Sequence, residues 1–365
     1  MDINEFKKYK DRNFFAYICT SWQVKGVEVA INTLRKKNER IKATVFVADH
    51  DITGRIVYKK DCPPIEDVEW VEVRCDEYNK LYKTENKIKR FSISEKSFRL
   101  KKDVYVFCPG NIDIRWLYLI TTAFNRGITI IFGDDGAGGY IGYGDLYKKS
   151  FINSIVHAYF IKKLYKTNRI IDQRILTKNE FGYVRNEIIA DEYEQVLSKG
   201  GSPLSKDIID YFSGKVLLNT QCLYDNKQID GEQDLNALQH LHDVLGDNRN
   251  KDVIIKPHPR ELSLDRYTRF PEWKVMSEIN ITQEEIFSKL KIKPKMIIGI
   301  HSSTLINLKA LFGIETISLV NFFEKENITS GEKKICKDFI KEFDGFVRCP
   351  KTDEELKNIV KNIID

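Results

Sequence analysis

A basic, proline-rich segment, KPHPR at residues 256–260, has the residue types needed to bind a charged ligand. It directly follows the apolar run at 253–255, and in open α/β sheets ligands bind at the carboxyl ends of such strands. The two prolines fix the backbone around His258, and Lys256 and Arg260 supply the positive charge that an anionic ligand requires. Taken alone, the segment could equally be a stiff turn with a solvated histidine.

A second segment, GDDGAGG at residues 133–139, follows the apolar run at 128–132. Glycine permits a sharp turn and a close approach of ligand to backbone. The adjacent carboxylates of Asp134 and Asp135 are candidates for a general base that removes a proton from a hydroxyl. An acidic turn without a catalytic role is the alternative. Paired aspartates can also bind a metal ion, but no histidine or third carboxylate lies nearby in sequence.

The third segment, IIGIHSST at residues 297–304, reads as a strand, a hydroxyl-bearing turn and the start of a helix. Hydroxyls and backbone N–H groups at a helix N-terminus bind phosphate. Ordinary N-capping by Ser303 or Thr304 explains the same residues, and both interpretations can hold together.

Apolar runs alternate with helical patterns in both halves of the chain, which predicts parallel βαβ units and doubly wound sheets of the α/β class. In the first half we expect strands at 14–20, 44–48, 68–73, 104–108 and 128–132, with one helix that has Ser21 as its N-cap and ends at 35–37, and another at 113–125. In the second half we expect strands at 215–220, 253–255, 296–300 and 316–320, with helices at 232–245 and 304–311.

The glycine- and proline-containing stretch at 200–203 is the clearest break in the chain, and residues 147–197 before it read as mainly helical. We therefore predict an N-terminal Rossmann-like domain at 1–197, a linker at 198–214, a second Rossmann-like domain at 215–350 and a C-terminal helix at 351–365. Two such domains facing a central cleft form the GT-B architecture.

Composition excludes several classes of protein. Apolar residues make up 42% of the chain and charged residues 31%, a normal balance for a globular protein. The seven cysteines form no CxxC pair, so we expect reduced cytosolic thiols and no zinc site. The net charge of +6 is spread along the chain, which argues against nucleic acid as a partner and suits a phosphorylated substrate or an anionic membrane surface.

Residues 147–171 mix lysines with aromatic side chains. A helix of this kind can lie on anionic lipid, or it can pack one face on a sheet and solvate the other. We expect a cytoplasmic protein, with peripheral association at the inner membrane face if the first interpretation holds. A homodimer is compatible with the sequence.

Together, the motifs DDG at 134–136, HP at 258–259 and SS at 302–303 resemble, in type and order, those of bacterial sialyltransferases of GT-B fold. The turn Ser21-Trp22-Gln23 is similar to the opening turn of the lipooligosaccharide sialyltransferases, with Trp22 in place of the family's proline.

The resemblance implies an acceptor-binding first domain, in which Asp135 is the base on the acceptor hydroxyl, and a CMP-donor-binding second domain. His258 would contact the donor phosphate and assist the departure of CMP, and a glutamate between the last two motifs, for which Glu278 is the candidate, would hold the nucleoside. The supporting residues of the first domain are Asp134, Gly136 and Gln23. The donor-binding residues are Lys256, Pro259, Arg260, Glu278, Ser302, Ser303 and Thr304.

The implied activity is an inverting, metal-independent transfer of sialic acid from CMP-sialic acid to a lipooligosaccharide, capsule or O-antigen glycan, with no cofactor. A monophosphate is a poorer magnesium ligand than the diphosphate of most sugar donors, so amino-acid side chains could neutralise it without a metal. Another GT-B transferase of surface polysaccharide synthesis, polysialylating or dependent on CMP-Kdo, remains an alternative. A non-catalytic nucleotide-sugar binding protein and a metal-dependent phosphohydrolase are further alternatives.

Overall fold

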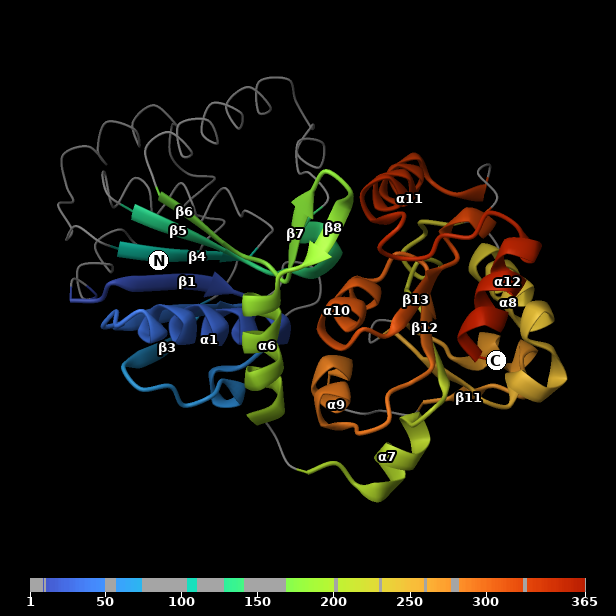
Figure 1. Ribbon diagram of the computed structural model, residues 1–365, viewed down its shortest axis with the longest axis horizontal. Helices are drawn as coiled ribbons and strands as arrows, with labels where there is room; N and C mark the ends of the chain where they lie inside the picture. The colour runs from blue at the N-terminus through green and yellow to red at the C-terminus, as the bar shows by residue number, and fades with distance from the viewer. Residues whose placement is uncertain are drawn as a thin grey trace. The chain divides into compact units, whose positions relative to one another are not determined.

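The computed structural model describes residues 9, 11–49, 57–73, 104–109, 128–140, 169–199, 203–229, 232–258, 261–276, 282–323 and 327–364. The chain divides into two compact units, Met1–Arg174 and Ile175–Asp365 (Figure 1). Each unit contains a parallel sheet with at least one helix packed on it, which confirms the predicted α/β class. The helix expected at 113–125 and residues 147–168 of the basic segment lie outside the described residues.

The first unit is built on a six-stranded parallel sheet with the order β3-β2-β1-β4-β5-β6. This 3-2-1-4-5-6 order is that of the Rossmann fold, and it reverses direction between β1 and β4. The strands are β1 (Phe14–Ile18), β2 (Ala43–Ala48), β3 (Val68–Val73), β4 (Val104–Pro109), β5 (Ile128–Gly133) and β6 (Arg169–Gln173). The first five lie where they were predicted: β1, β2, β4 and β5 are largely buried and almost continuously apolar, whereas β3 alternates apolar and acidic residues.

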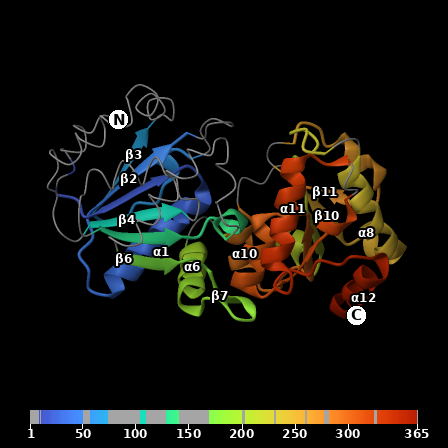
Figure 2. The same cartoon turned by 90° about the horizontal axis from the view of Figure 1, so that it is seen from above.

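Helix α1 (Ser21–Lys36) follows β1 and packs one face on this sheet (Figure 2). Its apolar side chains at Val24, Val27 and Leu34 are buried in the same cluster as β1, β2 and Phe107 of β4. The N-cap is Thr20, whose hydroxyl accepts a hydrogen bond from the backbone of Gln23, and not the predicted Ser21. Thr20 is the last residue with extended backbone angles, so Ser21 is already the first residue of the helix.

The second unit contains a five-stranded parallel sheet with the order β11-β10-β9-β12-β13, which reverses between β9 and β12. Its strands are β9 (Val216–Asn219), β10 (Val253–Lys256), β11 (Lys274–Val275), β12 (Met296–Gly299) and β13 (Glu315–Ser318). The main helices are α6 (Glu187–Lys199), α7 (Lys206–Phe212), α8 (Gln233–Asn250), α9 (Gln283–Lys289), α10 (Ser303–Phe312), α11 (Ser330–Phe343) and α12 (Asp353–Ile364). No helix in the described part of the chain is long and apolar enough to cross a membrane.

The prediction that 147–197 is mainly helical is wrong for residues 169–185. These residues form β6 and an antiparallel hairpin, β7 (Leu176–Asn179) and β8 (Gly182–Arg185). Short runs with few apolar residues do not show whether their period is that of a helix or a strand. Only α6 is helical in the described part of this range.

The structure also divides the chain at a different point from the predicted linker at 198–214. The hairpin and α6 precede that linker, yet they belong to the second unit. The reason is packing: α6 lies against α9 and α10, and the Arg185 guanidinium donates a hydrogen bond to the carbonyl of Ala310 at 2.8 Å.

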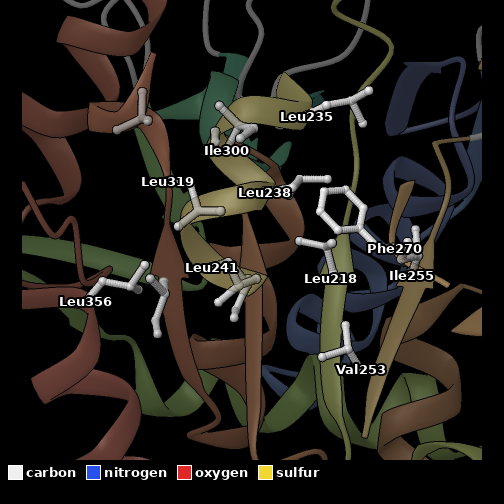
Figure 3. Close-up of a cluster of buried hydrophobic side chains, with 14 of the residues drawn as sticks. Leu218, Leu235, Leu238, Leu241, Val253, Ile255, Phe270, Ile300, Leu319 and Leu356 are labelled. Carbon is white, nitrogen blue, oxygen red and sulfur yellow. The ribbon is translucent and has the colours of Figure 1, made fainter. Parts of the chain in front are cut away.

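The core of the second unit lies between β9, β10, β12, β13 and helices α8 and α12 (Figure 3). Leu241 of α8 and Leu356 of α12 are both fully buried there. Figure 2 shows α12 beside α8, and the two helices are in contact. The C-terminal helix is therefore part of this core.

Replacing Leu356 with alanine should lower the free energy of unfolding by about 2–5 kcal/mol, because a fully buried leucine leaves a cavity. Chemical denaturation of the full chain measures this change. Lys357→Ala, at the exposed next position of the same helix, is the matched control and should stay close to wild type. Equal denaturation midpoints for the two variants would show that α12 does not contribute to the core.

Candidate active site

The acidic turn at the end of β5 is organised by Asp134. Asp134 is fully buried, and its carboxylate accepts hydrogen bonds from Trp22 Nε1 at 3.2 Å and from the backbone of Gly136 at 2.8 Å. The Tyr140 hydroxyl donates to the other carboxylate oxygen. Gly136 has φ of 68°, in the left-handed region that favours glycine. These contacts make Asp134 the residue that fixes the turn.

Asp135 is held differently, because it is half-buried and its Oδ1 accepts a hydrogen bond from Gln23 Nε2 at 2.8 Å. The carbonyl oxygen of the same glutamine side chain accepts a hydrogen bond from the backbone of Cys19 at 2.8 Å. Gln23 therefore connects the carboxyl end of β1 to Asp135, and it is itself buried. The structure brings together Asp134, Asp135, Gly136 and Gln23, the four residues predicted for this domain.

In the second unit, Glu261 and Thr220 hold the backbone of His258 in place. The backbone N–H of His258 donates to Thr220 Oγ1 at 3.1 Å and to Glu261 Oε1 at 2.9 Å. The Glu261 carboxylate also accepts hydrogen bonds from the Thr220 hydroxyl and, at 2.6 Å, from the Tyr267 hydroxyl. Burial, with Glu261 adding to it, raises the pKa of Tyr267 above its usual range, so the phenol remains a donor.

Lys256 ends β10 next to this loop, where it is partly buried. Burial lowers the pKa of its ammonium group, while the nearby carboxyls of Glu284 and Glu261 act in the opposite direction. Glu284 is buried, and this raises the pKa of its carboxyl despite a hydrogen bond from Asn307 Nδ2 at 2.9 Å. Lys256 thus lies at the edge of a buried polar layer.

The serine turn connects β12 to α10, and Ser302 is its N-cap. Ser302 Oγ accepts a hydrogen bond from the backbone of Thr304 at 3.3 Å, so the predicted caps, Ser303 and Thr304, instead form the first turn of the helix. A Cβ at Gly299 would lie 3.1 Å from the carbonyl oxygen of Asn219, so glycine allows β12 to approach β9 closely. The helix N-terminus and its hydroxyls are suited to binding an anion.

Two of the predicted donor-binding segments therefore lie at the carboxyl ends of β10 and β12, two strands that β9 separates in the sheet. Lys256 is the last residue of β10, His258 follows that strand, and Ser302 follows β12. The strand order reverses between β9 and β12, and ligands of open α/β sheets bind at such a reversal. Pro259, Arg260 and Glu278 lie outside the described residues.

The residues that hold these loops in place, Glu261, Trp22, Tyr140 and Tyr267, are not among the predicted site residues. Glu261 stands three positions after His258, the spacing at which a glutamate accepts a hydrogen bond from an earlier backbone N–H in a capping box, and this signal could have identified it. The contacts of Trp22, Tyr140 and Tyr267 have no comparable local signal.

Comparisons with known proteins agree with this architecture. A family model described as alpha-2,8-polysialyltransferase (POLYST) matches residues 14–321. No curated protein matches the chain in sequence.

Solved structures show the fold. The chain is similar to a putative UDP-N-acetylglucosamine 2-epimerase from Listeria monocytogenes, with TM-score 0.54 and 8% identity over 96% of this chain and 87% of that one. It is similar to a UDP-GlcNAc 2-epimerase from Methanocaldococcus jannaschii, with TM-score 0.51 and 11% identity over 96% and 93%. An alpha/beta-galactoside alpha-2,3-sialyltransferase from Photobacterium phosphoreum matches with TM-score 0.47 and 8% identity over 92% and 97%.

Proposed function

Because the chain belongs to the alpha-2,8-polysialyltransferase family, we propose that it transfers sialic acid from CMP-sialic acid to a hydroxyl of a surface glycan. It is a glycosyltransferase, and its family is one of sialyltransferases. We propose a sialic acid-terminated capsule or lipooligosaccharide chain as the acceptor, on the basis of the family description. Cytoplasmic location, peripheral membrane association and a homodimeric state remain predictions.

The structural observation that most strongly supports Asp135 as the base of this reaction is the difference between two adjacent carboxylates. Asp134 is fully buried and accepts hydrogen bonds from a tryptophan, a tyrosine and the backbone. Asp135 is half-buried and oriented by Gln23. A general base must be held in place and still reach a substrate, which Asp135 satisfies and Asp134 does not.

In the proposed reaction, Asp135 takes the proton of the acceptor hydroxyl while the hydroxyl oxygen bonds to the anomeric carbon of sialic acid. The bond from that carbon to the phosphate oxygen breaks, and its electron pair leaves with CMP. Attack on the face opposite CMP inverts the anomeric centre. A positioned base contributes about 10²–10⁴-fold to the rate of such a step.

On the donor side, we propose that Lys256, His258 and the N-terminus of α10 stabilise the negative charge that develops on the phosphate. Fixed donors and cations act most strongly where charge grows in the transition state. The backbone contacts of His258 with Thr220 and Glu261 hold this residue in place before the donor binds. Because these groups can neutralise the single phosphate of CMP, we propose that the reaction requires no metal ion.

The wild-type protein should therefore release CMP from CMP-sialic acid in the presence of a sialylated acceptor, at the same rate with and without EDTA. A coupled assay for CMP, with CMP-Kdo as the alternative donor, measures both donor choice and metal dependence. Loss of turnover in EDTA that magnesium restores would contradict the metal-independent mechanism. Turnover of CMP-Kdo alone would contradict the donor assignment.

A further inference from the structure

A buried polar network lies directly behind the serine turn, at the point where the strand order of the second unit reverses. His301 follows β12, and its backbone N–H donates to Gln221 Oε1 at 3.0 Å. Its ring Nδ1 lies 3.2 Å from Gln221 Nε2, and its ring Nε2 contacts Glu332 Oε1. Glu332 is fully buried in the first turn of α11, and its other oxygen accepts a hydrogen bond from Gln228 Nε2 at 3.1 Å.

Gln221 determines where the imidazole proton lies. A backbone N–H can only donate, so it must face the oxygen of the glutamine amide, which places the amide nitrogen against the ring. An amide nitrogen also only donates, and Nδ1 must therefore accept with its lone pair. His301 is then a neutral imidazole with its proton on Nε2, donating to the carboxylate of Glu332.

The same geometry decides against a metal ion, although His301, Glu332 and Cys336 place potential ligand atoms within 4.8 Å of one another. A metal would need the lone pair of Nε2, which carries the proton in this tautomer. The Cys336 thiol donates to Glu332 Oε1 at 3.6 Å, and burial raises the pKa of this thiol well above its usual range. These contacts therefore form a complete set of hydrogen bonds.

We propose that His301 is a positioning residue for the serine turn, tying its backbone to Gln221 and, through its ring, to the buried carboxylate of Glu332. Glu332 is held by Gln228 and by its own backbone N–H, which donates to Thr329 Oγ1 at 3.2 Å, so it provides a fixed anchor. The residue after His301 is Ser302, the N-cap of α10. His301 therefore determines where the first turn of α10 lies, and its role in donor binding rests on the proposed function.

The test compares His301→Leu with His301→Gln, because glutamine keeps an N–H donor near the position of Nε2 and leucine keeps only the volume. His301→Leu should raise KM for CMP-sialic acid about tenfold or more, with a smaller change in kcat, because the donor would have to order the loosened turn as it binds, and an ordering cost of about 1.4 kcal/mol is a factor of ten. His301→Gln should restore most of the wild-type KM. Amide hydrogen exchange at residues 303–305 should be faster in the leucine variant than in the glutamine variant.

Asn250→Leu is the control for general destabilisation of the same unit. Asn250 is buried and accepts a hydrogen bond from Trp273 Nε1 at 2.8 Å, immediately before the amino end of β10 and so at the opposite edge of the sheet. The Asn250→Leu variant should lower the stability of the protein without changing KM for the donor or amide hydrogen exchange at residues 303–305. Equal effects of His301→Leu and Asn250→Leu on both readouts would overturn the positioning role.

The tautomer is tested without any sugar donor. Imidazole ¹⁵N NMR of the wild-type protein should show a protonated Nε2 and an unprotonated Nδ1 for His301, unchanged by added zinc. A proton on Nδ1, or displacement of the Nε2 proton by zinc, would overturn the assignment. If the protein does not use CMP-sialic acid, the proposed function fails, while the NMR and hydrogen exchange results still decide the role of His301.

Discussion

Asp135→Asn should lower kcat for sialyl transfer about 100-fold or more, because an amide cannot take the proton of the acceptor hydroxyl. The amide is nearly isosteric with the carboxylate and can still contact Gln23, whose Nε2 lies 2.8 Å from Oδ1. We therefore expect thermal stability and KM for the donor to remain close to wild type. Initial rates of CMP release at saturating acceptor measure the effect.

Asp134→Asn is the contrasting variant at the adjacent position. An amide replaces one carboxylate oxygen with a donor, which opposes the hydrogen bond from Tyr140 if it takes the place of Oδ2, or those from Trp22 and Gly136 if it takes the place of Oδ1. Leaving buried polar groups badly paired costs about 1–3 kcal/mol, so this variant should lower the thermal stability of the protein. If Asp135→Asn retained wild-type kcat, the base would have to be another group.

His258→Ala should lower kcat/KM for CMP-sialic acid about 100- to 1000-fold, the typical effect of removing one group that stabilises developing charge. The backbone of the loop should stay in place, because its contacts to Thr220 and Glu261 come from the His258 N–H and not from the imidazole. The loss should therefore appear without a matching loss of stability.

His240→Ala is the matched control, since His240 lies on α8 with a half-exposed side chain that contacts Asp353. This variant should retain wild-type kinetics. Comparable rates for His258→Ala and His240→Ala would mean that the imidazole of His258 does not act on the donor.

Much of the fold could be predicted because most strands are buried on both faces and so are continuously apolar. β1 and β2 are almost entirely buried, and both lie where the sequence indicated. β11 contains only Lys274 and Val275, both exposed, and leaves no pattern to detect. The hairpin at 176–185 is also largely exposed, which explains why it was mistaken for helix.

The strand ends at which the site residues lie could be predicted from the sequence, but the hydrogen bonds between those residues could not. Asp134 and Asp135 are identical in type and adjacent in sequence, so no local rule separates their roles. Their different roles come from their contacts with Trp22 and Gln23, each of which lies 112 residues away in sequence from the aspartate that it contacts. Glu332 is likewise 31 residues from His301, and its burial depends on the packing of α11.

We propose that Asp135 serves as the base in a metal-independent transfer from CMP-sialic acid. The most direct measurement is product formation from CMP-sialic acid and a sialylated acceptor in EDTA, followed by mass spectrometry, for wild type and Asp135→Asn side by side. We expect an acceptor extended by sialic acid with the wild-type protein, and a rate that is lower by about 100-fold or more with the folded variant. Equal rates for the two proteins, or extension only after magnesium is added, would contradict this proposal.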